Sequence, residues 1–185
     1  MADTGWRRSS EPLDPLGLFE ALGRHQVRYV LVGGLAGVAH GWPGSTGDAD
    51  IVPATDKANL GRLGATLHEL DAVVWSDPDR DDLFPSGKPP EADDFGFTAE
   101  GLRRHPVWHL TSRVGLIDIV FQIAGVGTYD DLIGSAGVEH LDGVGEVPVA
   151  SLDDVIASKR AADRPKDRRV LPELEALRRR RPPAD

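Results

Sequence analysis

Short apolar runs rich in β-branched residues alternate along the chain with stretches in which apolar residues recur at helical spacing. The runs are bounded by glycine, proline or aspartate, which is typical of strands. They predict strands over residues 29–32, 48–52, 72–75, 107–112, 116–121, 138–141 and 146–149. Helical spacing predicts helices over residues 14–24, 35–40, 56–70, 129–135, 151–162, 167–171 and 172–180. In the last of these, Pro172 would suit the first turn.

Two pairs of the expected strands are separated by short turns and predict β-hairpins. The first turn contains Arg113-Val114-Gly115 and the second contains Asp142-Gly143. The pattern indicates an α+β fold, with a small mixed β-sheet, flanking helices and a C-terminal helical unit. We expect a flexible arm over residues 1–13, a core over residues 14–150, and the helical unit of the same domain over residues 151–185. Residues 77–94 are acidic and proline-rich, and we expect a long loop there.

The amino-acid composition excludes or disfavours several classes of function. The chain has no cysteine, which excludes disulfides, thiolate zinc sites and a cysteine nucleophile. Its formal net charge of −9 argues against a broadly basic nucleic-acid-binding surface. The basic residues nevertheless gather after Ser151, where they could contact a polyanion or simply form a solvated helix face. No apolar run is long enough for a membrane span or a signal peptide, so we expect a cytoplasmic protein with no membrane partner.

Three features could carry chemistry. Gly33 and Gly34 follow a strand and precede a helix, where backbone amides can approach a phosphate, although such a pair is more often only a tight turn. Asp48 and Asp50 project from the same face of the next strand, and a carboxylate pair of this kind suits Mg²⁺. Asp118 stands in an otherwise apolar strand, where a carboxylate is costly unless it is paired or binds a metal.

Together the Gly-Gly turn, the Asp-x-Asp pair and the later strand aspartate resemble the DNA polymerase beta-like nucleotidyltransferase superfamily. Within it, the chain looks most like small bacterial proteins related to the AbiEii toxin and to minimal nucleotidyltransferases. The resemblance rests on residues 29–52 and 149–159, and continues through Arg164-Pro165-Lys166-Asp167. A lysine on a C-terminal helix, then an arginine, then Lys-Asp is the usual order in that family.

The resemblance implies transfer of a nucleoside monophosphate from an NTP by a two-metal mechanism with Mg²⁺. Asp48, Asp50 and Asp118 would bind the metal, and Asp118 would also help to deprotonate the acceptor hydroxyl. The nucleotide would be bound by the remaining matched residues: Gly33, Gly34, Thr46, Lys159, Arg164 and Lys166. The acceptor could be tRNA or another RNA, a protein or a small molecule, and a cognate antitoxin is a possible partner.

The sequence departs from the family at Gly44, where relatives commonly carry an arginine two residues before the threonine. This departure motivates an alternative, a non-catalytic nucleotide-binding or antitoxin-type partner that keeps the fold. A third hypothesis is an Mn²⁺-dependent glycosyltransferase, which the early position of Asp48 disfavours. The six histidines show no metal-ligand spacing.

Overall fold

The molecule is built around a mixed β-sheet whose strand order brings distant parts of the chain together. The computed structural model describes residues 11–74, 96–141 and 145–180. Most of the expected arm and the acidic segment 77–94 therefore lie outside the described residues. Across the sheet, the order is β3-β4-β5-β2-β1-β7-β6. The strands are β1 (Tyr29–Val32), β2 (Asp48–Pro53), β3 (Val73–Val74), β4 (Val107–Ser112), β5 (Gly115–Val120), β6 (Gly137–Leu141) and β7 (Gly145–Val149).

Both expected hairpins are confirmed, since β4 pairs antiparallel with β5 and β6 pairs antiparallel with β7. The two central strands, β1 and β2, are also antiparallel. In contrast, β2 pairs with β5 and β1 pairs with β7 in parallel. The sheet is therefore mixed, as the sequence predicts, and β2 lies between β1 and β5 at its centre.

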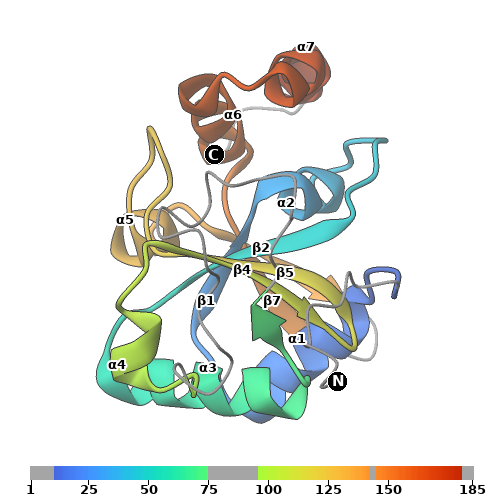
Figure 1. The fold of residues 1–185 in the computed structure, drawn as a ribbon. Coiled ribbons are helices and arrows are strands. Elements are labelled where there is room, and N and C mark those ends of the chain that lie inside the picture. The colour runs from blue at the N-terminus through green and yellow to red at the C-terminus, as the bar shows by residue number, and fades with distance from the viewer. Residues whose placement is uncertain (1–10, 75–95, 142–144, 181–185) are drawn as a thin grey trace.

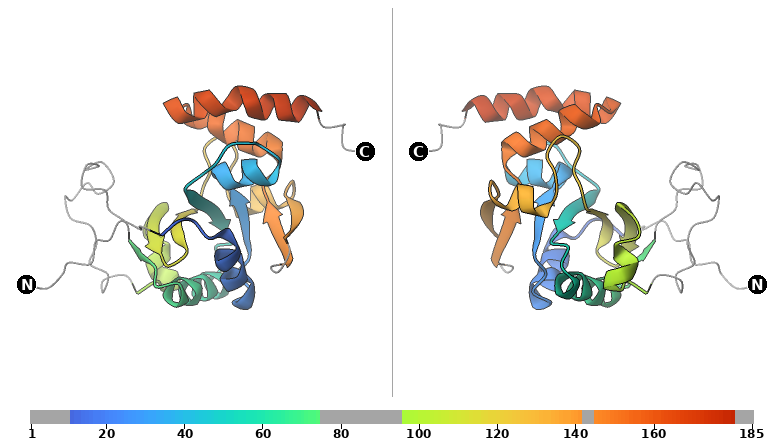
Figure 2. Two further views of the ribbon diagram at one scale, coloured as in Figure 1. Left: turned by 90° about the vertical axis from the view of Figure 1, so that its right-hand side faces the viewer. Right: turned by 90° about the vertical axis from the view of Figure 1, so that its left-hand side faces the viewer.

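The described helices lie on both sides of this sheet. They are α1 (Pro15–Arg24), α2 (Gly33–Ala39), α3 (Lys57–Glu69), α4 (Ala99–Leu102), α5 (Tyr129–Ile133), α6 (Leu152–Ala162) and α7 (Pro165–Arg180). Helices α1, α3 and α4 lie on one side, whereas α2, α6 and α7 lie on the other (Figure 1). Figure 2 shows α7 lying across α6 at the end of the molecule farthest from α3. No helix in the described part of the chain is both long and apolar enough to cross a membrane.

Side-chain alternation on the central strands separates the core from the opposite face of the sheet. Ile117 and Ile119 of β5 are fully buried, as are Ala49 and Ile51 of β2. The residues between them, including Asp118, are only partly buried. Because successive side chains of a strand point to opposite faces, the apolar set forms the core and the aspartates share the other face.

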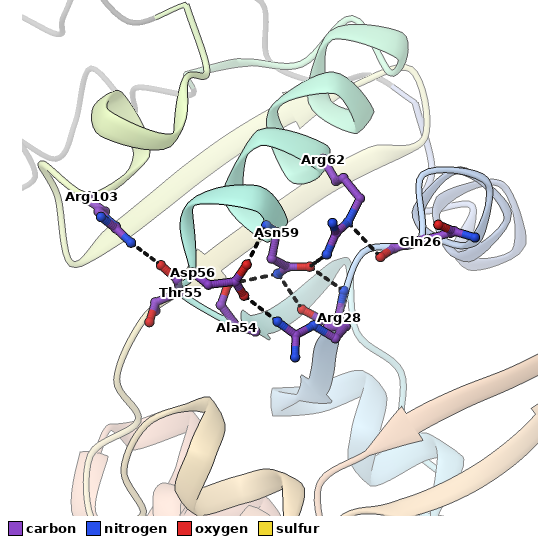
Figure 3. Close-up of polar contacts among 8 residues, drawn as sticks. All are labelled: Gln26, Arg28, Ala54, Thr55, Asp56, Asn59, Arg62 and Arg103. Atoms are coloured by element: carbon purple, nitrogen blue, oxygen red, sulfur yellow. Dashed lines mark hydrogen bonds and ion pairs between the residues drawn. The ribbon is translucent and has the colours of Figure 1, made fainter.

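A buried asparagine fastens α3 to the sheet. Asp56 caps α3 by accepting a hydrogen bond from the backbone N–H of Asn59, as the sequence predicts. The Asn59 side chain is fully buried and donates to the backbone carbonyls of Arg28 (2.9 Å) and Ala54 (2.8 Å). Its Oδ1 accepts from the Arg28 N–H (2.8 Å) and from the Arg62 guanidinium (3.1 Å). This network joins the start of β1 and the end of β2 to α3 (Figure 3).

The prediction of two short helices after Pro165 is wrong, because α7 is one helix that contains Pro172. Proline at an interior position removes a backbone donor and usually breaks a helix. Here Leu174, two turns beyond Asp167, is fully buried, and its side chain packs against the position of Gly37 in α2. This packing against α2 favours a continuous helix in spite of Pro172.

Candidate active site

Three carboxylates converge on the open face of the sheet, which is the face opposite the apolar core. In the parallel pairing of β2 with β5, Asp50 lies opposite Asp118, and Asp48 precedes Asp50 by two residues on the same face. One oxygen from each of the three side chains lies within 4.8 Å of the others. Each side chain is partly buried. The structure therefore brings together the three residues that the sequence singles out as possible metal ligands.

The electrostatics of this cluster favour a bound cation. The pKa of Asp50 is raised from its ordinary value of 3.8 to about 7, chiefly because the carboxyl is removed from water. The negative charges of Asp48 and Asp118 raise it further, while Lys166 and Lys159 oppose them only in part. Like charges held this close disfavour ionisation unless a positive charge lies between them. Three oxygen donors with excess negative charge suit a hard cation such as Mg²⁺.

Two glycines allow the backbone to approach the carboxylates. Gly33 has a φ of 66°, in the left-handed region that side chains avoid, and a Cβ there would collide with the Asp50 carboxylate. At Gly34 a Cβ would lie 2.7 Å from the Thr46 hydroxyl. That hydroxyl donates a 2.6 Å hydrogen bond to Oδ1 of Asp48. The Gly-Gly turn is thus fitted against Asp50 of the Asp-x-Asp pair and against Thr46.

The C-terminal helices place an ion-pair network, centred on a buried aspartate, near the carboxylate cluster. Asp167 of α7 is fully buried and accepts from the Arg164 guanidinium (2.7 Å), while Lys159 Nζ of α6 lies 3.4 Å away. Burial alone would raise the pKa of Asp167, but the hydrogen bond and charge of Arg164, with the charge of Lys159, lower it overall. The Lys159 side chain is only 13% exposed, whereas Lys166 is exposed. Asp167 therefore holds two cations at the site.

A cleft of about 490 Å³ runs between the open face of the sheet and the C-terminal helices. Every site residue predicted from the sequence lines it: Gly33, Gly34, Thr46, Asp48, Asp50, Asp118, Lys159, Arg164 and Lys166. The carboxylates come from β2 and β5, and the cations come from α6, α7 and the turn between them. A ligand in this cleft would meet negative charge on one side and positive charge on the other.

His109 also lines the cleft, and the sequence analysis missed it. It lies opposite Asp118 in the β4–β5 hairpin, and its Nδ1 is 2.9 Å from Oδ1 of Asp118. The hairpin expected from the sequence, with Arg113-Val114-Gly115 as its turn, would place residue 110 opposite residue 118. The observed turn is one residue shorter. A two-residue turn at Arg113 and Val114 places residue 109 opposite residue 118. Searching for metal-ligand spacing along the chain could not detect a pairing across strands.

Trp42 occupies the space that a side chain at position 44 would need. A Cβ at position 44 would collide with the indole ring of Trp42, which lines the cleft. The indole N–H donates a 2.6 Å hydrogen bond to the Glu173 carboxylate of α7. The space beside the loop is therefore filled by an aromatic side chain that also joins the loop to α7.

Comparisons with known proteins give a likeness of fold. No family model and no curated protein matches the sequence. Among solved structures, the lincosamide antibiotic adenylyltransferase LnuA, in complex with lincomycin, aligns with a TM-score of 0.54 and 14% identity, over 90% of this chain and 99% of that one. The antibiotic-resistance factor ANT(2'')-Ia aligns with a TM-score of 0.50 and 15% identity, over 88% of this chain and 86% of that one. The chain therefore shares its fold with a known nucleotidyltransferase.

Proposed function

We propose that this protein is a Mg²⁺-dependent nucleotidyltransferase that moves a nucleoside monophosphate from an NTP to an acceptor hydroxyl. The convergence of Asp48, Asp50 and Asp118 within 4.8 Å, on one wall of a cleft, carries the proposal. Cations on the opposite wall supply the charge that a triphosphate needs. The fold, shared with an adenylyltransferase, supports the same reaction class.

The carboxylates would hold the metal. Asp48, Asp50 and Asp118 offer only oxygen donors, which is the donor set that Mg²⁺ prefers. When bound there, Mg²⁺ would neutralise charge on the phosphates and make the acceptor hydroxyl easier to deprotonate. Asp118, which lines the same cleft, would also accept that proton, the role that the resemblance in sequence implies for it.

The opposite wall would bind the triphosphate. Lys159 and Arg164 are held by Asp167, so their positions are set before a nucleotide arrives. Lys166 is exposed and has room to reach a phosphate. Gly33 and Gly34 would let phosphate oxygens approach the backbone, and Thr46 would hold Asp48 in place. Preorganised positive charge of this kind stabilises the charge that develops during phosphoryl transfer.

For the acceptor we favour a small-molecule hydroxyl. Beyond Asp118 and His109, the cleft is lined by Val107, Val120 and Ile123. Such an apolar wall suits a compact organic molecule better than a sugar–phosphate backbone. LnuA is described as a lincosamide antibiotic adenylyltransferase, which provides a precedent for such an acceptor on this fold. RNA and protein hydroxyls are the alternatives.

The proposal is tested by incubating the purified protein with each α-³²P-labelled NTP, Mg²⁺ and separate small-molecule, RNA and protein fractions of a cell lysate. We expect label to move to a component of the small-molecule fraction, and this transfer to be lost in Asp50→Ala. Asp130→Ala, which removes an exposed carboxylate of α5, is the matched control and should transfer normally.

Label in the RNA or protein fraction would keep the reaction and change the acceptor. Binding of Mg-NTP without transfer to any fraction would favour the non-catalytic nucleotide-binding alternative. Co-purification with a second protein that suppresses transfer would favour a toxin–antitoxin role. Absence of both binding and transfer would refute the proposed function.

A further inference from the structure

His109 contacts the carboxylate cluster but has no role in the proposed reaction. Its Nδ1 lies 2.9 Å from Oδ1 of Asp118, and the two side chains are 30% and 19% exposed. The pair is fixed by the backbone, because residues 109 and 118 are direct partners in the antiparallel β4–β5 ladder. Cross-strand partners of this kind have adjacent Cβ atoms, so the contact needs no unusual side-chain conformation.

The chemistry of this 2.9 Å contact sets which of the two atoms carries the proton. An ionised carboxylate can only accept hydrogen bonds, so Nδ1 of His109 must carry the proton that lies between it and Asp118. A neutral imidazole satisfies this requirement in its Nδ1–H tautomer. The contact therefore requires a proton on Nδ1, whether the imidazole is neutral or charged.

The contact matters because Asp118 shares its site with two other carboxylates. Without a restraint, the Asp118 side chain could rotate away from Asp48 and Asp50 to reduce repulsion. Asp48 has such a restraint, since the Thr46 hydroxyl donates a 2.6 Å hydrogen bond to its Oδ1. His109 provides the corresponding donor for Asp118, on the opposite side of the cluster. Hydrogen bonds from outer residues orient metal-binding carboxylates and raise metal affinity.

We propose that His109 is a positioning residue that holds one oxygen of Asp118 and leaves the other directed to a divalent cation. The proposal rests on the proposed function in so far as the three carboxylates bind metal. It assigns to His109 no contact with the metal and no role as the base. It predicts that the donor at the Nδ1 position, and not the rest of the ring, is what the site requires.

The test compares His109→Asn, His109→Gln and His109→Ala in the full chain. The amide nitrogen of asparagine can occupy the position of Nδ1, whereas that of glutamine extends to the position of Nε2. Mn²⁺ affinity is measured by electron paramagnetic resonance without nucleotide, and kcat and KM are measured where transfer is detected. His140→Ala, on the exposed strand β6 at one edge of the sheet, is the control. Thermal unfolding shows that each variant is folded.

We expect His109→Ala to weaken Mn²⁺ binding by about 10- to 100-fold and to lower kcat more than it raises KM for the NTP. His109→Asn should remain within about threefold of the parent chain, and His140→Ala should be unchanged. Rescue by glutamine but not by asparagine would overturn the proposal, because the Nε2 position would then be the important one. Equal Mn²⁺ affinity in His109→Ala and the parent chain would also overturn it. If the parent chain itself bound no Mn²⁺, the proposed function would fail first.

Discussion

Changing Asp50 and Asp167 to asparagine makes the same chemical alteration on opposite walls of one cleft, with opposite effects expected on stability. Asp50 lies among like charges, and their repulsion lowers the stability of the folded state. Asp167 is fully buried but lies between two cations. Asparagine keeps the size of aspartate and removes its charge. Without divalent metal, Asp50→Asn should therefore stabilise the fold, and Asp167→Asn should destabilise it.

The magnitude at Asp50 follows from its pKa. The carboxyl titrates at about 7 in the folded protein, against an ordinary value of 3.8. At about 1.4 kcal/mol for each pH unit, this difference corresponds to an upper limit of roughly 4 kcal/mol in the free energy of unfolding. Because asparagine must still find hydrogen bonds in the same place, we expect a gain on the order of 1–3 kcal/mol.

The contribution of each carboxylate to the stability of the fold changes with pH in a definite direction. Between about pH 4 and pH 7 the folded chain keeps a proton on Asp50 that the unfolded chain has lost, so this group makes the fold less stable as pH rises. The advantage of Asp50→Asn is then absent near pH 4 and complete above about pH 7.5. Asp167 behaves in the opposite way, since its pKa is lowered. Its contribution is present above its ordinary pKa and is lost as pH falls through the lowered value.

For Asp167→Asn we expect the free energy of unfolding to fall by about 3 kcal/mol near neutral pH. This value is at the lower end of the range for breaking a buried ion pair. Lys159, which is 13% exposed, would lose its carboxylate partner. Arg164 is 58% exposed and can turn to water, which moderates the loss.

Urea unfolding of both variants and the parent chain, in EDTA at about pH 5 and about pH 8, measures these differences. Addition of Mg²⁺ at the higher pH should stabilise the parent chain more than Asp50→Asn, by mass action. If Asp50→Asn is less stable than the parent chain in EDTA at the higher pH, the electrostatic account of the carboxylate cluster is wrong.

Two further substitutions, each with a control, test residues that support the site. Asn59→Ala should lower the free energy of unfolding by about 2–4 kcal/mol, because two carbonyls and one N–H lose their buried partner. Arg62→Ala, beside it on α3, should cost under about 1 kcal/mol in the same urea titration, and equal losses would contradict the burial argument. Gly33→Ala should weaken Mn²⁺ binding at least about tenfold, since its Cβ would displace Asp50. Gly47→Ala, with open space at its Cβ, should bind Mn²⁺ normally.

Much of the fold could be predicted because local chemistry and tertiary packing agree. The strand over residues 29–32, the cap at Asp56 and both hairpins follow from patterns that involve neighbouring residues. The convergence of Asp50 with Asp118 needs the parallel pairing of β2 with β5, which no local pattern specifies. The continuity of α7 through Pro172 was missed for the same reason. A helix propensity does not include the packing of Leu174 near Gly37 in α2.

Asp118 was singled out because a carboxylate is costly in an apolar strand, whereas the candidate cations of the C-terminal helices came from the resemblance to a family. A residue whose importance depends on its contact with another side chain cannot be recognised from its own type in this way. Trp42 could be taken for a core aromatic until its ring is seen against Gly44 and its N–H on Glu173. His109 becomes meaningful only when the register of its hairpin is applied.

The parallel pairing of β2 with β5 has a consequence for how the protein folds. Asp48 and Asp50 lie on a strand that can join β1 early, while Asp118 reaches them only after a long intervening segment has closed. Repulsion between Asp118 and the other two carboxylates is then absent until β5 pairs with β2. Relief of this repulsion should slow unfolding more than it speeds folding. In this way the charge that prepares the site for a metal shortens the lifetime of the empty native state and leaves the rate of its formation almost unchanged.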